Sequence, residues 1–240
     1  MTVEAALLVL LTLVASTVGT TTGFGISTIM IPVMAVFVPL PVALMFVGII
    51  HLFGDAWNML LFKGGLRWRL ILGFGIPGMA ASYAGAALTV AAGDLEVKKI
   101  LGLFLMAYVI FLFVNRTWAL PGNNITAVAG GLLSGLFAGF FGVGGAVRSA
   151  FLTAFDLPKE TYVFTSGIIA FFIDIVRIHR YWLSGVDLGG PLAAALVLCV
   201  PASLAGAFLG RRFLQGLPQR HFRLFVAGFL FLAGLRLLLS

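Results

Sequence analysis

The chain has few charged residues and almost no cysteine. Only 10% of its 240 residues are Asp, Glu, Lys or Arg, and its mean hydropathy is +1.14. A soluble domain carries about a quarter charged residues, so this composition excludes an ordinary soluble protein. The single cysteine, Cys199, excludes an internal disulfide and a metal site built from paired cysteines.

Motifs typical of enzymes and of ATP-driven pumps are also absent. The sequence contains no His-Glu-x-x-His zinc motif, no Gly-x-Ser-x-Gly nucleophile motif and no Gly-x-x-x-x-Gly-Lys-Ser/Thr phosphate loop. We therefore expect neither an enzyme nor a nucleotide-driven pump, with no cofactor and no bound metal.

Long apolar runs dominate what is present. Hydrophobic residues make up 61% of the chain, in runs that do not alternate, which favours spanning helices over a β-barrel. The net charge is +7, but the basic residues cluster in a few loops, as the positive-inside rule predicts. We therefore expect contact with a lipid bilayer and not with nucleic acid. The sequence predicts an all-α, multi-pass integral membrane protein with apolar segments at 5–19, 23–37, 41–62, 68–92, 98–114, 125–141, 144–156, 160–182, 188–210 and 221–239.

The sequence repeats itself at about half its length. At an offset of 119 residues, nine of the 33 positions from 23 to 55 are identical, and Asp55 coincides with Asp174. At an offset of 121, both copies contain Ala-Ser-x-Ala-Gly-Ala-x-Leu, at 81–88 and 202–209. We therefore expect two transmembrane repeats, 1–120 and 121–240, within one membrane domain. Transporters built from such repeats bind their substrates near the repeat interface.

Each repeat is predicted to begin with a glycine-broken helical hairpin, followed by three transmembrane helices. The hairpin arms, 5–19/23–37 and 125–141/144–156, have 13 to 17 residues, fewer than the ~20 that a spanning helix needs. Glycine-rich breaks at 19–23 and 141–145 join the arms. Irregular backbone at membrane depth is tolerated only where protein or a watery cavity surrounds it. We therefore expect both hairpin tips to lie inside the membrane.

The charges of the loops orient the two repeats. Basic loops at 63–69 and 211–223, and the linker with Arg116, are predicted to be cytoplasmic, and the balanced loop 94–99 external. The two repeats then have inverted topologies, with both termini outside. The same topology places three cationic residues, Arg177, His179 and Arg180, near the external face, which conflicts with the positive-inside rule. This conflict indicates either an error in the topology or a role for these cations.

Two aspartates lie about fifteen residues into their helices, near the middle of the membrane. A charge at that depth costs ~2.5–3.5 kcal/mol on translocon scales, so Asp55 and Asp174 are expected to be paired or functional. His51, Asp55 and Asn58 are spaced i, i+4, i+7 and share one helix face. Because histidine titrates near neutral pH, we predict that these three residues and Asp174 couple transport to protons. The alternatives are a structural pair of Asp174 with Arg177 and a plain interhelical hydrogen bond of His51.

Arg148 is the most specific candidate for binding a ligand. It follows the second glycine break by three residues, where a helix should begin again. Amide N–H groups at a helix start, the positive end of the helix dipole and a guanidinium can converge on an anion. The alternative is that Arg148 neutralises an intramembrane aspartate. The predicted anion site comprises Gly23, Gly25, Gly142, Gly144, Gly145, Arg148, Thr165, Ser166 and Arg177.

The repeated glycine breaks resemble those of the TauE/SafE family of sulfite exporters and anion permeases. The matching residues are Gly23-Phe24-Gly25 with Pro32, and Gly142-Val143-Gly144-Gly145 with Thr165-Ser166-Gly167. The first copy departs from the family by its shorter glycine run, and the second has Phe151 where Pro32 maps. The resemblance implies proton-coupled movement of a small sulfur-containing or organic anion across a bacterial inner membrane.

These features together predict a secondary transporter of a small anion, sulfite or an organosulfonate, coupled to protons. An uncoupled, channel-like permease is an alternative. Its flux would not respond to an imposed pH gradient, which would distinguish it from a proton-coupled transporter. A non-transport subunit of a membrane complex is another, although long soluble loops for binding a partner are absent. The sequence leaves the oligomeric state open, and a homo-oligomer is compatible with it.

Overall fold

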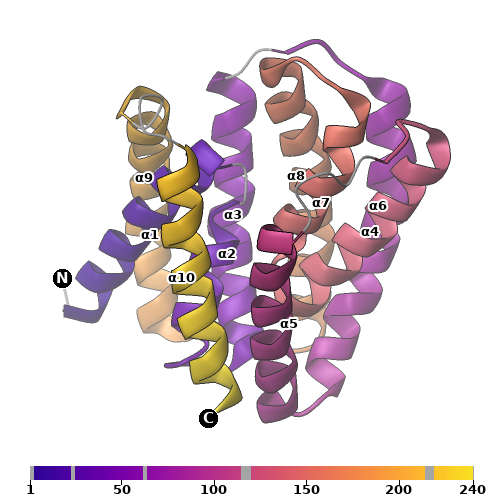
Figure 1. The fold of residues 1–240 in the computed structure, drawn as a ribbon. Coiled ribbons are helices and arrows are strands. Elements are labelled where there is room, and N and C mark those ends of the chain that lie inside the picture. Colours follow the sequence, from indigo (N-terminus) through magenta and orange to yellow (C-terminus); the bar gives the residue numbers. More distant parts are fainter. Residues whose placement is uncertain (1–2, 23–24, 62–63, 115–119, 214–218, 240) are drawn as a thin grey trace.

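The computed structural model describes residues 3–22, 25–61, 64–114, 120–213 and 219–239, which form helices and no strand (Figure 1). Each predicted apolar segment coincides with a helix, so the predicted all-α membrane fold is confirmed. A 3₁₀ turn, η1 (Thr153–Phe155), extends α7. In chain order the α-helices are α1 (Val3–Thr22), α2 (Ser27–Met34), α3 (Leu40–Leu61), α4 (Trp68–Ala91), α5 (Asp94–Val114), α6 (Asn124–Phe141), α7 (Gly144–Leu152), α8 (Lys159–Leu183), α9 (Gly189–Phe213) and α10 (Gln219–Leu238).

The first arm of each hairpin is longer than predicted. Helices α1 and α6 have 20 and 18 residues and are long and apolar enough to cross a bilayer, as are α3, α4, α8 and α9. The prediction that both arms of each hairpin are too short to span is therefore wrong for α1 and α6. In α1 the hydroxyls of Thr12 and Thr17 donate to carbonyls four residues back, so threonines fit the helix. The second arms, α2 and α7, are short as predicted, with 8 and 9 residues.

Glycines in left-handed backbone mark both breaks. Gly142 (φ +71°) ends α6, and Gly25 (φ +82°) precedes α2 by two residues. Only glycine adopts such angles readily. The second break lies where the sequence predicts it. The first lies later than 19–23, because α1 remains helical to Thr22; Gly23 and Phe24 lie outside the described residues.

Helices of the two halves pack on each other in matching pairs. Helix α4 packs on α6 and α9 on α1, while α3 faces α8 and α5 lies beside α10 (Figure 1). If the two halves are exchanged, the α4–α6 pair becomes the α9–α1 pair, and the α3–α8 and α5–α10 pairs become themselves. Gly85 lies against the Leu136 carbonyl and Gly206 against the Leu13 carbonyl, so the duplicated small-residue segments let helix backbones approach closely. This arrangement places α3 and α8, the helices that carry the two aspartates, face to face.

Candidate functional site

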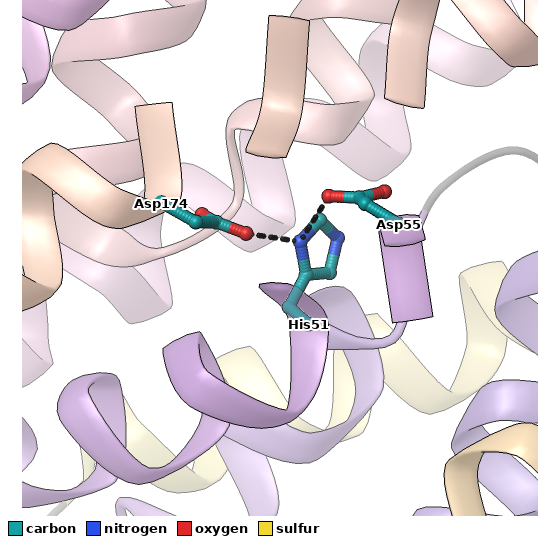
Figure 2. Close-up of side chains that lie close together, drawn as sticks. All are labelled: His51, Asp55 and Asp174. Carbon is teal, nitrogen blue, oxygen red and sulfur yellow. Dashed lines mark hydrogen bonds and ion pairs between the residues drawn. The ribbon is translucent and has the colours of Figure 1, made fainter. Parts of the chain in front are cut away.

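The two repeat-related aspartates meet at one histidine. Nδ1 of His51 lies 2.6 Å from Oδ2 of Asp174 and 3.0 Å from Oδ2 of Asp55 (Figure 2). His51 and Asp55 come from α3 and Asp174 from α8, and none of the three residues is more than 7% exposed. The cluster therefore lies in the interior, at the contact between the two halves, where the repeats predict a site.

Arg177 completes the cluster from α8. Its Nε donates to Oδ1 of Asp174 at 2.6 Å, and Nη1 donates to the Ala138 carbonyl at 3.5 Å. The side chain is 1% exposed, so this cation is buried with its counter-ion and does not lie at the external surface. The structural pairing of Asp174 with Arg177 that the sequence offered as an alternative is thus present. It also explains why Arg177 departs from the loop-charge rule.

His51, Asp55 and Asp174 also have ligand types that metals accept, with their ligand atoms within 4.8 Å of one another. The distances between these ligand atoms fit a hydrogen bond better than a bound metal ion. A separation of 2.6 Å between Nδ1 and the Asp174 oxygen is that of a charge-assisted hydrogen bond. A metal bound at about 2.0–2.2 Å to both atoms would have to push them apart. The geometry therefore favours an imidazole that is hydrogen-bonded to Asp174 and lies at ion-pair distance from Asp55.

A cavity of about 510 Å³, including open space at its mouth, lies beside this cluster. The part of it that water-sized groups can occupy is about 50 Å³, enough for a group of a few atoms. Both halves line it: α1, the first break and α3 from one, and α7 and α8 from the other. The lining residues are Gly19, Thr20, Gly25, Ile26, His51, Gly54, Asp55, Asn58, Arg148, Tyr162, Val163, Ser166 and Gly167.

Arg148 is a buried cation in the wall of this cavity. It is 5% exposed, and its Nε donates to Oγ of Ser166 at 2.9 Å. Among the described residues no carboxylate lies within ion-pair distance of Arg148, since Asp55 pairs with His51, and Asp174 pairs with His51 and Arg177. Arg148 therefore makes no direct ion pair with an aspartate in the described part of the chain, and its charge acts on Asp55 only from a longer distance. A buried charge without a partner is unfavourable, which makes this guanidinium a natural ligand for an anion.

Six of the predicted site residues line the cavity: Gly25, His51, Asp55, Asn58, Arg148 and Ser166. Gly23 lies outside the described residues. The remaining predicted residues do not line it: Gly142, Gly144, Gly145, Thr165, Asp174 and Arg177. Two of these glycines serve packing, since a side chain on Gly142 would meet Ile31 and Leu44, and one on Gly144 would meet α6.

Tyr162 is a cavity residue that was not among the predicted site residues. It lines the cavity one helical turn before Ser166, on the same face of α8, and that i, i+4 spacing was the available signal. Asn58, one turn from Asp55 on α3, lines the same space, and its Oδ1 has no hydrogen-bond partner among the described residues. The cavity thus combines one guanidinium and neutral polar side chains, which a small oxyanion can use as donors, with the ring of His51 and the carboxylate of Asp55.

Comparison with known proteins identifies the family of the chain. No curated protein and no solved structure matches the chain. The profile of the sulfite exporter TauE/SafE family matches residues 8–237, nearly the whole chain. The chain therefore belongs to the sulfite exporter TauE/SafE family and is a multi-pass membrane transporter of anions, not an enzyme.

Proposed function

We propose that the cavity binds a small anion, sulfite or an organosulfonate, and that the protein moves it across the membrane as a secondary transporter coupled to protons. The observation that carries this proposal is Arg148, a buried arginine in the cavity wall with no carboxylate partner in the described part of the chain. Among the described residues its terminal nitrogens, Nη1 and Nη2, have no hydrogen-bond partner. They can therefore donate to a bound anion.

Neutral polar groups complete the proposed anion site. The Ser166 hydroxyl holds Nε of Arg148, and the Tyr162 hydroxyl and the Asn58 amide share the cavity wall. The oxygen and nitrogen of an amide are exchangeable by rotation, so Asn58 can present N–H donors to an oxyanion. Groups on α3, α7 and α8 would then contact one ligand from both halves.

The paired halves supply a route for alternating access. We take 1–120 and 121–240 as inverted repeats. The helix packing supports this, because exchanging the two halves turns the contact of α4 with α6 into the contact of α9 with α1. The proposed site lies where the halves meet and beside the break at Gly25. Rocking of one half against the other would open the cavity to one side of the membrane at a time.

Proton coupling is assigned to the cluster of His51, Asp55 and Asp174, with Asn58 beside it in the cavity. The histidine contacts both carboxylates and also lines the cavity. A proton gained or lost at this cluster changes the charge next to a bound anion, so proton and anion affinities are linked.

Uptake into liposomes tests the proposal. The purified protein is reconstituted, and uptake of radiolabelled sulfite is measured with and without a pH gradient, in competition with taurine, sulfoacetate, thiosulfate, sulfate and acetate. We expect saturable uptake that responds to the gradient, and the strongest competitor identifies the substrate class. Saturable uptake that ignores the gradient would replace the coupled mechanism by an uncoupled permease. The absence of uptake and of competition for every anion, beside protein-free liposomes, would contradict the proposed function.

A further inference from the structure

The two ring nitrogens of His51 face different surroundings. Nδ1 lies against the carboxylates of Asp174 and Asp55, which both accept hydrogen bonds when ionised, so Nδ1 carries a proton (Figure 2). The second nitrogen, Nε2, lies on the side of the ring away from Asp174 (Figure 2). The protonation state of the imidazole is therefore decided at Nε2.

Nε2 lies at the wall of the cavity, beside the first break. A Cβ added to Gly25 would lie 2.6 Å from Nε2, so the backbone of the break approaches this atom closely. His51 and Gly25 both line the cavity. In the described part of the chain, Nε2 has no hydrogen-bond partner, and it is not among the fully enclosed polar atoms without one. It is thus an open position next to the space proposed for the anion.

The charges around His51 balance without it. With both carboxylates ionised, as this scheme requires, Asp55 and Asp174 contribute two negative charges, and Arg177 and Arg148 two positive charges. The net charge of the site is therefore the charge of the imidazole. When the ring is neutral, Nε2 presents a lone pair, which repels an anion. When the ring is protonated, Nε2 presents an N–H donor, and the site carries one positive charge.

We propose that His51 is itself a ligand of the transported anion, and that a monoanion binds to the imidazolium form through the Nε2–H donor, so that one proton is bound with each negative charge. This inference rests on the proposed function and deepens it. The bound proton comes from solvent and adds to Nε2, and the loaded site has no net charge. Electroneutral loading avoids the cost of an unbalanced charge inside the membrane.

The other groups around His51 keep their charges constant in this scheme. Asp174 is held by Arg177, and Arg148 and Tyr162 face the same cavity from α7 and α8. Helix α2 has no charged side chain. The charged residues of α1, α5 and α9 lie within the first or last two turns of those helices: Glu4, Asp94, Glu96, Lys98, Lys99, Arg211 and Arg212.

Calorimetry with the purified, full-length protein in detergent tests the proposal. Binding of methanesulfonate and of acetate, monoanions that do not themselves titrate near neutral pH, is measured in buffers of different ionisation enthalpy over a pH series that spans the histidine range. We expect uptake of up to about one proton per monoanion in the upper part of the series, falling to zero once the ring is already protonated. In liposomes, uptake of the monoanion should not change when a potassium gradient with valinomycin sets the membrane potential.

Variants separate His51 from the rest of the site. We expect His51→Gln to bind the anion at least about tenfold more weakly, because a charge-assisted donor is lost, and without proton uptake. His179→Gln is the matched control, because His179 is exposed on α8 beside Trp182 and outside the cavity; it should behave as the unmodified protein.

The outcomes distinguish the two proposals. Anion binding by the unmodified protein without proton uptake at any pH would overturn the role of His51 and leave the anion site intact, and so would proton uptake that persists in His51→Gln. Failure of every anion to bind would overturn the proposed function, and this inference with it. The first measurement needs no variant, so it does not depend on the folding of His51→Gln.

Discussion

Nδ1 of His51 lies 2.6 Å from Oδ2 of Asp174, although the two residues are 123 positions apart and belong to different halves of the chain. Asp174 is bonded on its other oxygen to Arg177, so this carboxylate connects a fixed cation to a titratable ring. In the described part of the chain, the only ion pair of Asp55, its counterpart in the first half, is with His51. The duplication thus places two equivalent aspartates at one site but gives them unequal surroundings.

This inequality predicts different effects of neutralising each aspartate. Asp174→Asn leaves Arg177 buried without its counter-ion, a change that costs about 3–5 kcal/mol of stability. Asp55→Asn removes one contact, at 3.0 Å, so its fold should persist while the pH dependence of flux weakens. Thermal unfolding in detergent and flux at several pH values measure the two effects. Equal stability of the two variants would contradict the unequal pairing, and unchanged pH dependence in Asp55→Asn would remove Asp55 from coupling.

Ser166 is expected to act by positioning Arg148. Its hydroxyl accepts from Nε at 2.9 Å, and removing a hydrogen bond to a charged group costs about 1.5–3 kcal/mol. We therefore expect Ser166→Ala to weaken anion binding about tenfold or more. Thr165→Val is the neighbouring control, because Oγ1 of Thr165 is buried without a hydrogen-bond partner among the described residues. Affinity that changes equally in both variants would argue against a specific role for Ser166.

Gly25 is predicted to tolerate no side chain. Its φ of +82° costs a non-glycine residue roughly 1–2 kcal/mol, and a Cβ would press on Nε2 of His51. Gly25→Ala should therefore lower the unfolding temperature and weaken anion binding. In Gly75→Ala the new methyl meets no atom within 4 Å inside helix α4, so stability should stay the same or rise. A Gly25→Ala protein as stable and active as Gly75→Ala would show that the break does not press on His51.

The inverted orientation of the repeats predicts opposite accessibility for two equivalent loops. The loop between α3 and α4 contains Gly65, and the loop between α8 and α9 contains Asp187; both residues are exposed. In a Cys199→Ser background, we expect Asp187→Cys to react with an impermeant thiol reagent in intact cells. Gly65→Cys should react only after the membrane is opened. Labelling of both from the same side would refute the inverted topology.

Much of the fold could be predicted from patterns within single segments of the sequence. Apolar length located the helices, and the breaks followed from glycine, because few other residues accept the backbone angles of Gly25 and Gly142. The lengths of α1 and α6 were underestimated, since glycine and threonine normally disfavour helices and only packing reverses this. Helix α1 packs on α9 and α6 on α4, contacts that local sequence cannot reveal.

The candidate site was predictable where symmetry or helix spacing identified its members. Asp55 and Asp174 were found by the repeat, and His51 and Asn58 by their shared helix face. Which cation pairs with which anion depends on helix rotation and tilt, and sequence does not fix these. For that reason the sequence left open whether Arg148, Arg177 or both neutralise an aspartate, whereas in the structure Arg177 is bound to Asp174 and Arg148 lines the cavity.

The most direct test of the account is sulfite uptake by liposomes that contain Arg148→Ala, beside the unmodified protein and Arg180→Ala, under an imposed pH gradient. Arg180 is on α8 but bonds to Ser184 and lies over the ring of Tyr83, outside the cavity. With folding checked by thermal unfolding, the account predicts that Arg148→Ala loses affinity more than about tenfold while Arg180→Ala keeps it. Full affinity in Arg148→Ala would contradict the account.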